Sequence, residues 1–166
     1  ILGRESVYLD PSELNDFYIG KTVLVTGAGG SIGSELCRQL AGLGLTRLIL
    51  VDHSEYHLFE IHAELSGAEV ELVPEVLDVR DVPTIETVLQ RERPSVIFHA
   101  AAYKHVLLME RQPMMAIRNN VLATHQLARV AAEQGVGHFI LISTDKAVAP
   151  SSVMGATKRL AEQVLQ

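Results

Sequence analysis

The sequence predicts an α/β fold in which helices cover both faces of a parallel sheet, the doubly wound arrangement. Short apolar runs alternate with longer segments in which apolar residues recur at helical spacing, as in repeated strand-helix-strand units. The short runs are apolar at almost every position, which is typical of strands buried on both faces. A glycine-rich segment at residues 27–33 joins the first run to the first helical segment. Together these observations favour one sheet of parallel strands.

The individual elements follow from the same pattern. Strands are expected at residues 22–26, 47–52, 70–77, 96–100 and 138–143. Helices are expected at residues 31–41, 54–65, 82–90 and 113–134, with a last one from about residue 152. Ser54 and Asp81 are predicted N-caps, because their side-chain oxygens accept hydrogen bonds from the free amides of a first turn. A short leading helix is expected at residues 11–17, with Asp10 as its cap and Pro11 in its first position.

Length and hydrophobicity predict a single domain. The chain has 166 residues, of which 48% are hydrophobic, which is enough for one sizeable core but too little for two ordinary domains. We expect a linker or short leading helix at residues 1–20 and the domain at residues 21–166. The last helical pattern is still running at Gln166, and a doubly wound sheet usually adds a sixth strand. The chain is therefore expected to be part of a longer protein, truncated before a C-terminal domain.

Charge and composition exclude several classes of function. A formal net charge of −6 without a run of Lys and Arg argues against a nucleic-acid partner, because phosphate backbones require clustered cations. No apolar stretch approaches the roughly 20 residues of a bilayer-spanning helix, so no membrane contact is expected from these residues. The single cysteine, Cys37, is interpreted as a packed core thiol. His57 and His62 lie five residues apart rather than four, and no metal site is predicted.

The glycine segment has the residues and position of a phosphate-binding turn. It follows a predicted strand and opens a helix, so backbone amides and the positive helix end converge where a pyrophosphate binds. Glycine is needed because a Cβ would block that approach. An ordinary tight turn is the alternative. The predicted phosphate contacts are Gly27, Gly29, Gly30, Ser31, Ile32 and Gly33.

An acidic residue, Asp52, ends the second predicted strand about 20 residues beyond this turn. Its carboxylate can accept hydrogen bonds from both hydroxyls of an adenosine ribose, so turn and acid together predict a Rossmann domain that binds a nicotinamide dinucleotide. A helix cap is the alternative role. The carboxylate would repel a 2′-phosphate and the following His53 and Ser54 supply no Arg, so NAD is preferred, with NADP as the alternative.

The ends of the third and fourth strands complete the predicted cofactor site. Asp78 and Val79 lie where such folds contact the adenine, although an acid at a strand end is as often simply solvated. Three small side chains end the fourth strand and allow a cofactor to approach closely, while a tight helix contact would explain them equally well. These three are Ala100, Ala101 and Ala102.

Four polar residues follow the fifth strand at the carboxyl edge, where doubly wound sheets bind ligands. They are Ser143, Thr144, Asp145 and Lys146. With them the sequence resembles the extended short-chain dehydrogenase/reductase superfamily, and within it the nucleotide-sugar 4,6-dehydratases of the CapD-like polysaccharide-biosynthesis group. The spacing of Gly27, Gly30 and Gly33 is the variant that short-chain dehydrogenases use. The resemblance covers nearly the whole chain and rests on residues 26–33, 52–55, 99–105, 119–121, 143–146 and 153–158.

This resemblance implies a reaction on a UDP-N-acetylhexosamine. Bound NAD takes hydride from C4, water leaves across C5 and C6, and hydride returns to C6. Because the 4-keto group acidifies the C5 proton, a base can remove it while an acid protonates the leaving 6-hydroxyl. By resemblance Asp145 is the acid, Lys146 the base, and Thr144 binds the sugar 4-oxygen. Lys158 binds the nicotinamide ribose. A lysine such as Lys146 can act as a base only when its surroundings lower its pKa.

Further residues are assigned by the same resemblance. Ser143 is placed in the cofactor site. The family places cofactor and substrate contacts after the fourth strand, at His99, Tyr103, Lys104 and His105. Of these, Lys104 and His105 are assigned to the substrate, although a solvated surface position explains Lys104 equally well. Asn119 and Asn120 interrupt a helical pattern, and the family uses an Asn here to order a water and the active-site lysine. Asn120 is assigned to the cofactor site, with an ordinary polar helix face as the alternative.

The sequence departs from the superfamily at one catalytic position. The usual motif Tyr-x-x-x-Lys stacks two side chains on one helix face, but here it reads Met154-x-x-x-Lys158. A thioether carries no proton, so Thr144 or a water relayed to Asp145 must replace the tyrosine base. Some dehydratases of this group resemble the chain in having Met there. Core packing and substrate lining are equally good interpretations of Met154.

The sequence therefore predicts a UDP-N-acetylglucosamine 4,6-dehydratase of surface polysaccharide synthesis. A nucleotide-sugar 4-epimerase and a non-catalytic NAD-binding scaffold are the alternatives. The acid–base pair argues against an epimerase, which eliminates no water. Asp145, Lys146 and Lys158 together argue against a scaffold, which needs no catalytic residues. This chain alone is expected to turn over little or no sugar. The complete protein is expected to be a homo-oligomer, either cytoplasmic or the cytoplasmic domain of a membrane-anchored protein.

Overall fold

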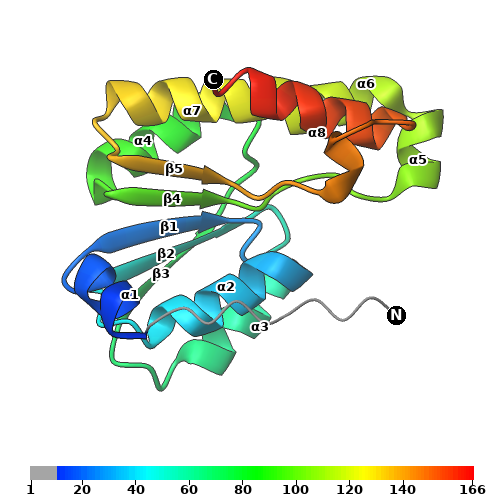
Figure 1. Cartoon of the computed structure of the whole chain (residues 1–166). Coiled ribbons are helices and arrows are strands. Elements are labelled where there is room, and N and C mark those ends of the chain that lie inside the picture. Colours follow the sequence, from blue (N-terminus) through cyan, green and yellow to red (C-terminus); the bar gives the residue numbers. More distant parts are fainter. Residues whose placement is uncertain (1–10) are drawn as a thin grey trace.

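A five-stranded parallel sheet with the strand order β3-β2-β1-β4-β5 forms the centre of the domain (Figure 1). The computed structural model describes residues 11–166, with side chains from residue 15 onward. The strands are β1 (Thr22–Thr26), β2 (Arg47–Asp52), β3 (Glu71–Val76), β4 (Val96–His99) and β5 (His138–Leu141). The predicted doubly wound Rossmann fold is confirmed.

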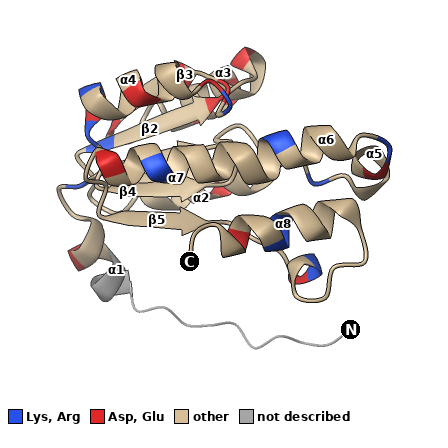
Figure 2. Ribbon diagram, turned by 90° about the horizontal axis from the view of Figure 1, so that it is seen from above, with Lys and Arg blue, Asp and Glu red and all other residues tan. Residues whose placement is uncertain are grey.

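Helices cover both faces of this sheet (Figure 1). One layer, below the sheet in Figure 1, consists of α1 (Pro11–Tyr18), α2 (Ser31–Ala41) and α3 (Glu55–Leu65). The other consists of α4 (Val82–Glu92), α5 (Val106–Arg111), α6 (Pro113–Ala116), η1 (Ile117–Ala123), α7 (Thr124–Glu133) and α8 (Val153–Gln163). Helix α8 packs against η1 and α6, and Lys and Arg are interspersed with Asp and Glu along the helices (Figure 2). Of the helices in residues 11–166, none has both the length and the apolar composition to cross a bilayer.

Burial on both faces explains why the strands are apolar at consecutive positions. In β1, Val23 and Val25 belong to the core cluster beneath α2 and α3, while Leu24 belongs to the cluster beneath α4 and α7. All three side chains are fully buried. Successive side chains of a strand point to opposite faces, and here each face is covered by helices. Cys37 lies in the first of these clusters, as predicted.

The two predicted caps are confirmed. The side chain of Ser54 accepts a hydrogen bond from the His57 amide, and that of Asp81 accepts one from the Thr84 amide. Strands β3, β4 and β5 are each shorter than expected, by one or two residues at the carboxyl end and, for β3, by one residue at the start. The predicted cap Asp10 lies outside the described residues.

The helix predicted over residues 113–134 is confirmed as far as Glu133, but it is not a regular α-helix throughout. The segment begins as α6, continues as the π-helical turn η1 and then as α7, and the unpredicted helix α5 precedes it. A π-helical turn contains an additional residue, and here both Asn119 and Asn120 become buried. A 3₁₀ turn, η2 (Asp145–Ala147), was also not expected. Helix α8 ends at Gln163, three residues before the point to which the pattern was expected to run.

Candidate functional site

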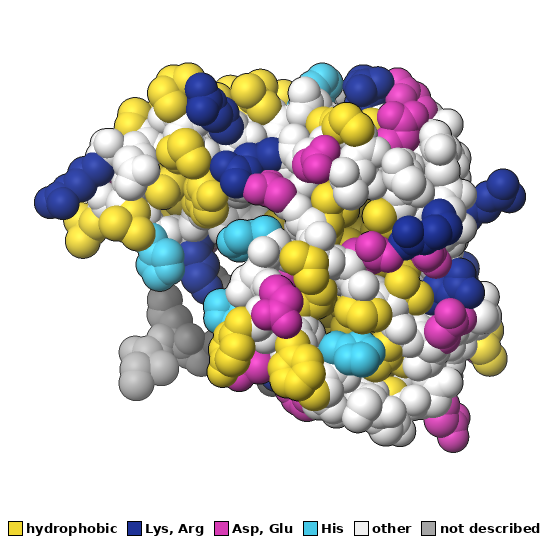
Figure 3. Space-filling view, turned by 180° about the vertical axis from the view of Figure 1, so that it is seen from behind, with side chains coloured by type: hydrophobic (Ala, Val, Ile, Leu, Met, Phe, Trp, Pro, Cys, Tyr) yellow, Lys and Arg dark blue, Asp and Glu magenta, His cyan; other side chains and the backbone are white. Residues whose placement is uncertain are grey.

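A cavity of about 580 Å³ opens at the carboxyl ends of the strands. Figure 3 shows this edge from behind, hollowed between the two layers, with histidine side chains at its rim. Its volume lies in the range of cofactor and ligand pockets. Of the predicted site residues, it is lined by Gly27, Gly30, Ser31, Ile32, Gly33, Asp52, His53, Asp78, Val79, Ala100, Ala101, Ala102, Lys104, His105, Ser143, Thr144, Lys146, Met154 and Lys158.

The glycine turn brings backbone close to backbone at two positions. Gly27 has a φ of +68°, and a Cβ there would lie 2.8 Å from the Ala101 nitrogen. A Cβ on Gly33 would lie 1.9 Å from the Gly27 carbonyl oxygen, so α2 packs against the turn only because no side chain intervenes. Among the described residues no side chain caps the first turn of α2. Its free amides therefore face the cavity, which suits an anionic pyrophosphate.

The carboxylate of Asp52 joins the end of β2 to the glycine turn. Its Oδ2 accepts a hydrogen bond from the Gly29 amide at 3.0 Å, and its Oδ1 accepts one from the Ser54 amide at 2.9 Å. His53 Nδ1 lies 3.3 Å from Oδ1. Although Asp52 is only 6% exposed, it lines the cavity, and each carboxylate oxygen has a second lone pair that a ribose hydroxyl can use.

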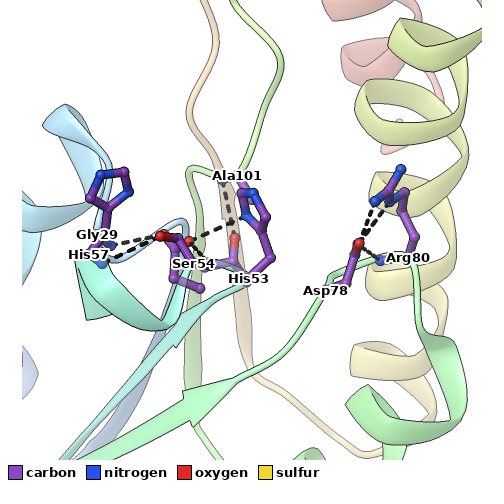
Figure 4. A network of polar contacts seen from close by, with 9 residues as sticks. Gly29, His53, Ser54, His57, Asp78, Arg80 and Ala101 are labelled. Atoms are coloured by element: carbon purple, nitrogen blue, oxygen red, sulfur yellow. Dashed lines mark hydrogen bonds and ion pairs between the residues drawn. The ribbon is translucent and has the colours of Figure 1, made fainter. Parts of the chain in front are cut away.

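An arginine that the sequence did not indicate lies beside Asp78 at the same end of the cavity. Arg80 Nε donates to both carboxylate oxygens of Asp78, at 2.9 and 3.0 Å, and the Arg80 amide donates to Oδ1 (Figure 4). Hydrogen bonds from this guanidinium hold the pKa of Asp78 below its usual value. Asp78 is therefore ionised at neutral pH and fixes the position of Arg80, which also lines the cavity.

Lys158 lies at the opposite end of the cavity on α8. It is 5% exposed, and its Nζ donates to the Ile142 carbonyl oxygen at 2.6 Å. Burial lowers its pKa to about 8, partly opposed by the charge of Glu162. Glu162 also accepts a hydrogen bond from Ser143 Oγ at 2.6 Å. Two side chains of α8 therefore bind the residues that follow β5.

The 3₁₀ turn η2 presents the predicted acid and base. Thr144 Oγ1 donates to Asp145 Oδ1 at 3.0 Å, and Lys146 Nζ lies 3.6 Å from the same oxygen. These contacts lower the pKa of Asp145, the hydrogen bond from Thr144 contributing most. A Cβ on Gly155 would lie 2.5 Å from the Lys146 carbonyl oxygen, so this glycine lets η2 approach α8. Asp145 itself is exposed and does not line the cavity.

Comparison with known proteins gives the family of this chain. Residues 23–166 match the family described as polysaccharide biosynthesis protein. The chain belongs to this family. It is 50% identical over 169 residues to the capsular polysaccharide biosynthesis protein CapD of Staphylococcus aureus, and 46% identical over 168 residues to the probable polysaccharide biosynthesis protein EpsC of Bacillus subtilis. These matches cover 100% and 99% of this chain but 28% of each relative.

Further matches connect the family to sugar-nucleotide enzymes. A UDP-glucose 4-epimerase of Rickettsia bellii is 31% identical over 155 residues, which cover 89% of this chain and 43% of that protein. The structure of Pen from Bacillus thuringiensis superposes with a TM-score of 0.84 at 27% identity, over 89% of this chain and 45% of that one. MoeE5 in complex with UDP-glucose and NAD superposes with a TM-score of 0.73 at 26% identity, over 87% and 48%.

In this member of the polysaccharide biosynthesis family, the two adjacent asparagines have different positions. Asn119 lines the cavity, whereas Asn120 lies behind it. Asn120 Oδ1 accepts from the Tyr103 amide at 2.8 Å, and its Nδ2 donates to the Tyr103 carbonyl at 3.0 Å and to Thr157 Oγ1 at 3.1 Å. Asn120 thus fixes the loop after β4 to α8. Because both residues lie in η1, no periodicity in the sequence could have shown which of them faces the cavity.

Met154 is both packed in the core and part of the cavity wall, the two positions that the sequence left open. It is buried against Met109 and Ala116, and it also lines the cavity, one helical turn before Lys158. Lys104, assigned to the substrate, donates from Nζ to Ser31 Oγ at 3.5 Å and so reaches the glycine turn.

Two further predicted residues, Gly29 and Ser54, lie outside the cavity lining and support it through hydrogen bonds. The Gly29 amide donates to Asp52, and Ser54 caps α3. Several lining residues were not in the predicted set. They are Val51, His57, Leu77, Arg80, Tyr103, Asn119 and Ile142.

Proposed function

We propose that this chain is the NAD-binding part of a nucleotide-sugar 4,6-dehydratase that acts on a UDP-N-acetylhexosamine in surface polysaccharide synthesis. The observation that carries the proposal is the position of η2. It places Thr144 and Lys146 on the wall of a cavity whose opposite end is the glycine turn, with Asp145 hydrogen bonded to Thr144. An acid and an amine next to a dinucleotide site suit elimination of water, which needs proton transfer at two atoms.

The described residues fit NAD as the cofactor. The uncapped first turn of α2 would receive the pyrophosphate, and Asp52 would accept both ribose hydroxyls. NAD is preferred over NADP because a 2′-phosphate would lie beside the Asp52 carboxylate. When bound, NAD supplies the acceptor and then the donor of hydride. The description of MoeE5, which names NAD and UDP-glucose, supports the same cofactor and a UDP-sugar substrate.

The chemistry of the chain's own side chains follows from their contacts. Lys158, held by the Ile142 carbonyl, would bind the nicotinamide ribose and favour loss of the C4 hydroxyl proton through its positive charge. Met154 can carry no proton, so Thr144 on the same wall would accept the C4 hydroxyl proton while passing its own hydroxyl proton to Asp145, or a water would relay the proton to Asp145. Lys146 would then remove the C5 proton, and Asp145 would protonate the leaving 6-hydroxyl.

The acid role of Asp145 requires a change in its surroundings. In the described chain the side chain is 77% exposed and its pKa is lowered by Thr144 and Lys146, so it is ionised at neutral pH. A general acid needs a raised pKa. We infer that bound substrate provides this change, because it would exclude water from η2 and bring the negative diphosphate of UDP near the carboxylate.

A nucleotide-sugar 4-epimerase is the second candidate, favoured by the similarity to the Rickettsia bellii epimerase. Both reactions begin with oxidation at C4, but only the dehydratase eliminates water. The complete protein incubated with UDP-N-acetylglucosamine should therefore give a product that is lighter by one water. A product of unchanged mass with inverted C4 would refute the dehydratase and support the epimerase.

Variants of the acid and base sharpen this test. Asp145→Asn and Lys146→Met should each lower the rate of water loss by about 100-fold or more, the usual contribution of a positioned acid or base. NAD affinity should stay unchanged, because the predicted cofactor contacts are elsewhere. Glu69→Gln, an exposed residue before β3, makes the same change of charge away from the site and should leave the rate unchanged. Full turnover in Asp145→Asn would contradict the assigned role.

A further inference from the structure

The side chain of His99 is buried directly behind the cavity. It ends β4, pairs in register with Thr26 of β1 and is 1% exposed. Its Nδ1 lies 2.7 Å from Thr26 Oγ1 and its Nε2 lies 2.9 Å from Thr124 Oγ1. Neither His99 nor Thr124 belongs to the cavity lining. Both ring nitrogens therefore bind hydroxyl groups of other segments rather than a ligand.

Backbone groups bind the two threonine hydroxyls at the ends of this chain of hydrogen bonds. The Ala101 amide donates to Thr26 Oγ1 at 3.3 Å (Figure 4), and the Thr124 hydroxyl donates to the Asn120 carbonyl at 2.9 Å. The Thr124 oxygen therefore accepts from Nε2–H. Among the described residues the Thr26 hydroxyl has no other acceptor than the ring, so it donates to Nδ1. All groups are satisfied only when the imidazole is neutral with its proton on Nε2.

Both ends of this hydrogen-bond chain reach segments that line the cavity. Thr26 directly precedes Gly27, and Ala101 is itself part of the lining. At the other end, the Asn120 carbonyl lies in η1 next to Asn119, which also lines the cavity. One ring thus connects the glycine turn, the loop after β4 and η1, which come from three separate parts of the sequence.

We propose that His99 is a positioning residue for the dinucleotide: through Thr26 and Thr124 it aligns the glycine turn, the Ala101 backbone and η1 in the geometry that binds the cofactor. The proposal rests on the NAD site of the proposed function and adds to it a residue that touches no ligand. The imidazole of His99 is also neutral on electrostatic grounds, because burial and the nearby charge of Lys158 lower its pKa to about 3. A protonated ring would be repelled by the nearby charge of Lys158 and would lose the Thr26 hydroxyl as a donor.

The test compares the NAD dissociation constants of variants by calorimetric titration. His99→Leu leaves the Thr26 and Thr124 hydroxyls without their ring partners, and we expect the constant to rise about tenfold, which corresponds to about 1.4 kcal/mol. Thr124→Val should weaken binding in the same direction. His99→Gln, whose amide again offers one acceptor and one donor, should bind within about threefold of the unaltered chain.

A matched control separates positioning from loss of stability. Leu89→Ala removes a buried side chain of α4, outside the cavity lining, and should lower stability without changing the dissociation constant. In a double-mutant cycle, His99→Leu and Thr124→Val should be less than additive, because either one breaks the same connection. A folded His99→Leu variant that binds NAD as tightly as the unaltered chain would overturn the inference.

A second measurement does not depend on the cofactor. The ¹⁵N chemical shifts of the His99 ring at pH 7 should show a protonated Nε2 and an unprotonated Nδ1, and the opposite tautomer or an imidazolium would overturn the proposed proton order. Failure of the unaltered chain to bind NAD would overturn both this inference and the cofactor of the proposed function. NAD binding that is indifferent to His99→Leu would overturn this inference alone.

Discussion

Replacement of Lys158 by methionine should change how the stability of the chain depends on pH. The ordinary pKa of a lysine, 10.5, falls to about 8 in the folded chain because the ammonium is buried. At about 1.4 kcal/mol per pH unit, this difference corresponds to about 3 kcal/mol of folding free energy. Lys158→Met has a similar apolar stem and no proton to lose, so it isolates the cost of the buried charge.

The sign follows from the protons bound in each state. Below about pH 8, Lys158 is protonated in both folded and unfolded chains, and the full cost of burying the charge is present. Between about pH 8 and 10.5 the folded chain has lost this proton while the unfolded chain keeps it, so the free energy of unfolding rises with pH. The stability of Lys158→Met relative to the unaltered chain should therefore fall by about 3 kcal/mol from pH 7 to pH 10.5.

Urea unfolding of both proteins at several pH values between 7 and 10.5 measures this difference. Other groups that titrate in the range contribute equally to both proteins and cancel. Lys158→Met also loses the hydrogen bond to the Ile142 carbonyl, which a neutral amine can still donate, so this loss is present at every pH and the trend with pH is the test. A difference that stays constant, or one that changes in the opposite direction, would refute the reasoning from burial.

Three further predictions concern the glycine turn, the carboxylate of Asp52 and the cysteine. Gly33→Ala places a Cβ 1.9 Å from the Gly27 carbonyl oxygen, so thermal unfolding should show a free energy of unfolding lower by at least about 2 kcal/mol. In the control Gly67→Ala the added Cβ meets nothing within 4 Å, and the free energy of unfolding should change by about 0.5 kcal/mol or less. Asp52→Asn should weaken NAD binding about tenfold and narrow the preference over NADP; titration with both cofactors checks this, and an unchanged ratio contradicts it. Burial raises the pKa of Cys37 to about 12, so a thiol reagent at pH 8 should react only as the chain unfolds, and complete labelling of the native chain within minutes would contradict this.

The sequence by itself determined the layers of the fold and one end of the site. The five strands were predictable because burial on both faces requires continuous apolar runs, and Ser54 and Asp81 marked helix starts because free amides need acceptors. The glycine turn and Asp52 were predictable for a similar reason. Their spacing along the chain reflects a local backbone requirement and the fixed length of one strand-helix-strand unit.

Only the tertiary structure decided the other features, because they depend on contacts between segments distant in sequence. Asn119 faces the cavity and Asn120 turns away because η1 meets the loop after β4 and helix α8. Arg80 lines the cavity because its guanidinium is hydrogen bonded to Asp78 after the end of β3. The resemblance placed His99 near cofactor and substrate contacts, but only the packing of β1 and α7 shows that each ring nitrogen binds a threonine hydroxyl behind the cavity. Periodicity reports which side of an element is buried, whereas a hydrogen-bond partner is fixed only when the elements pack together.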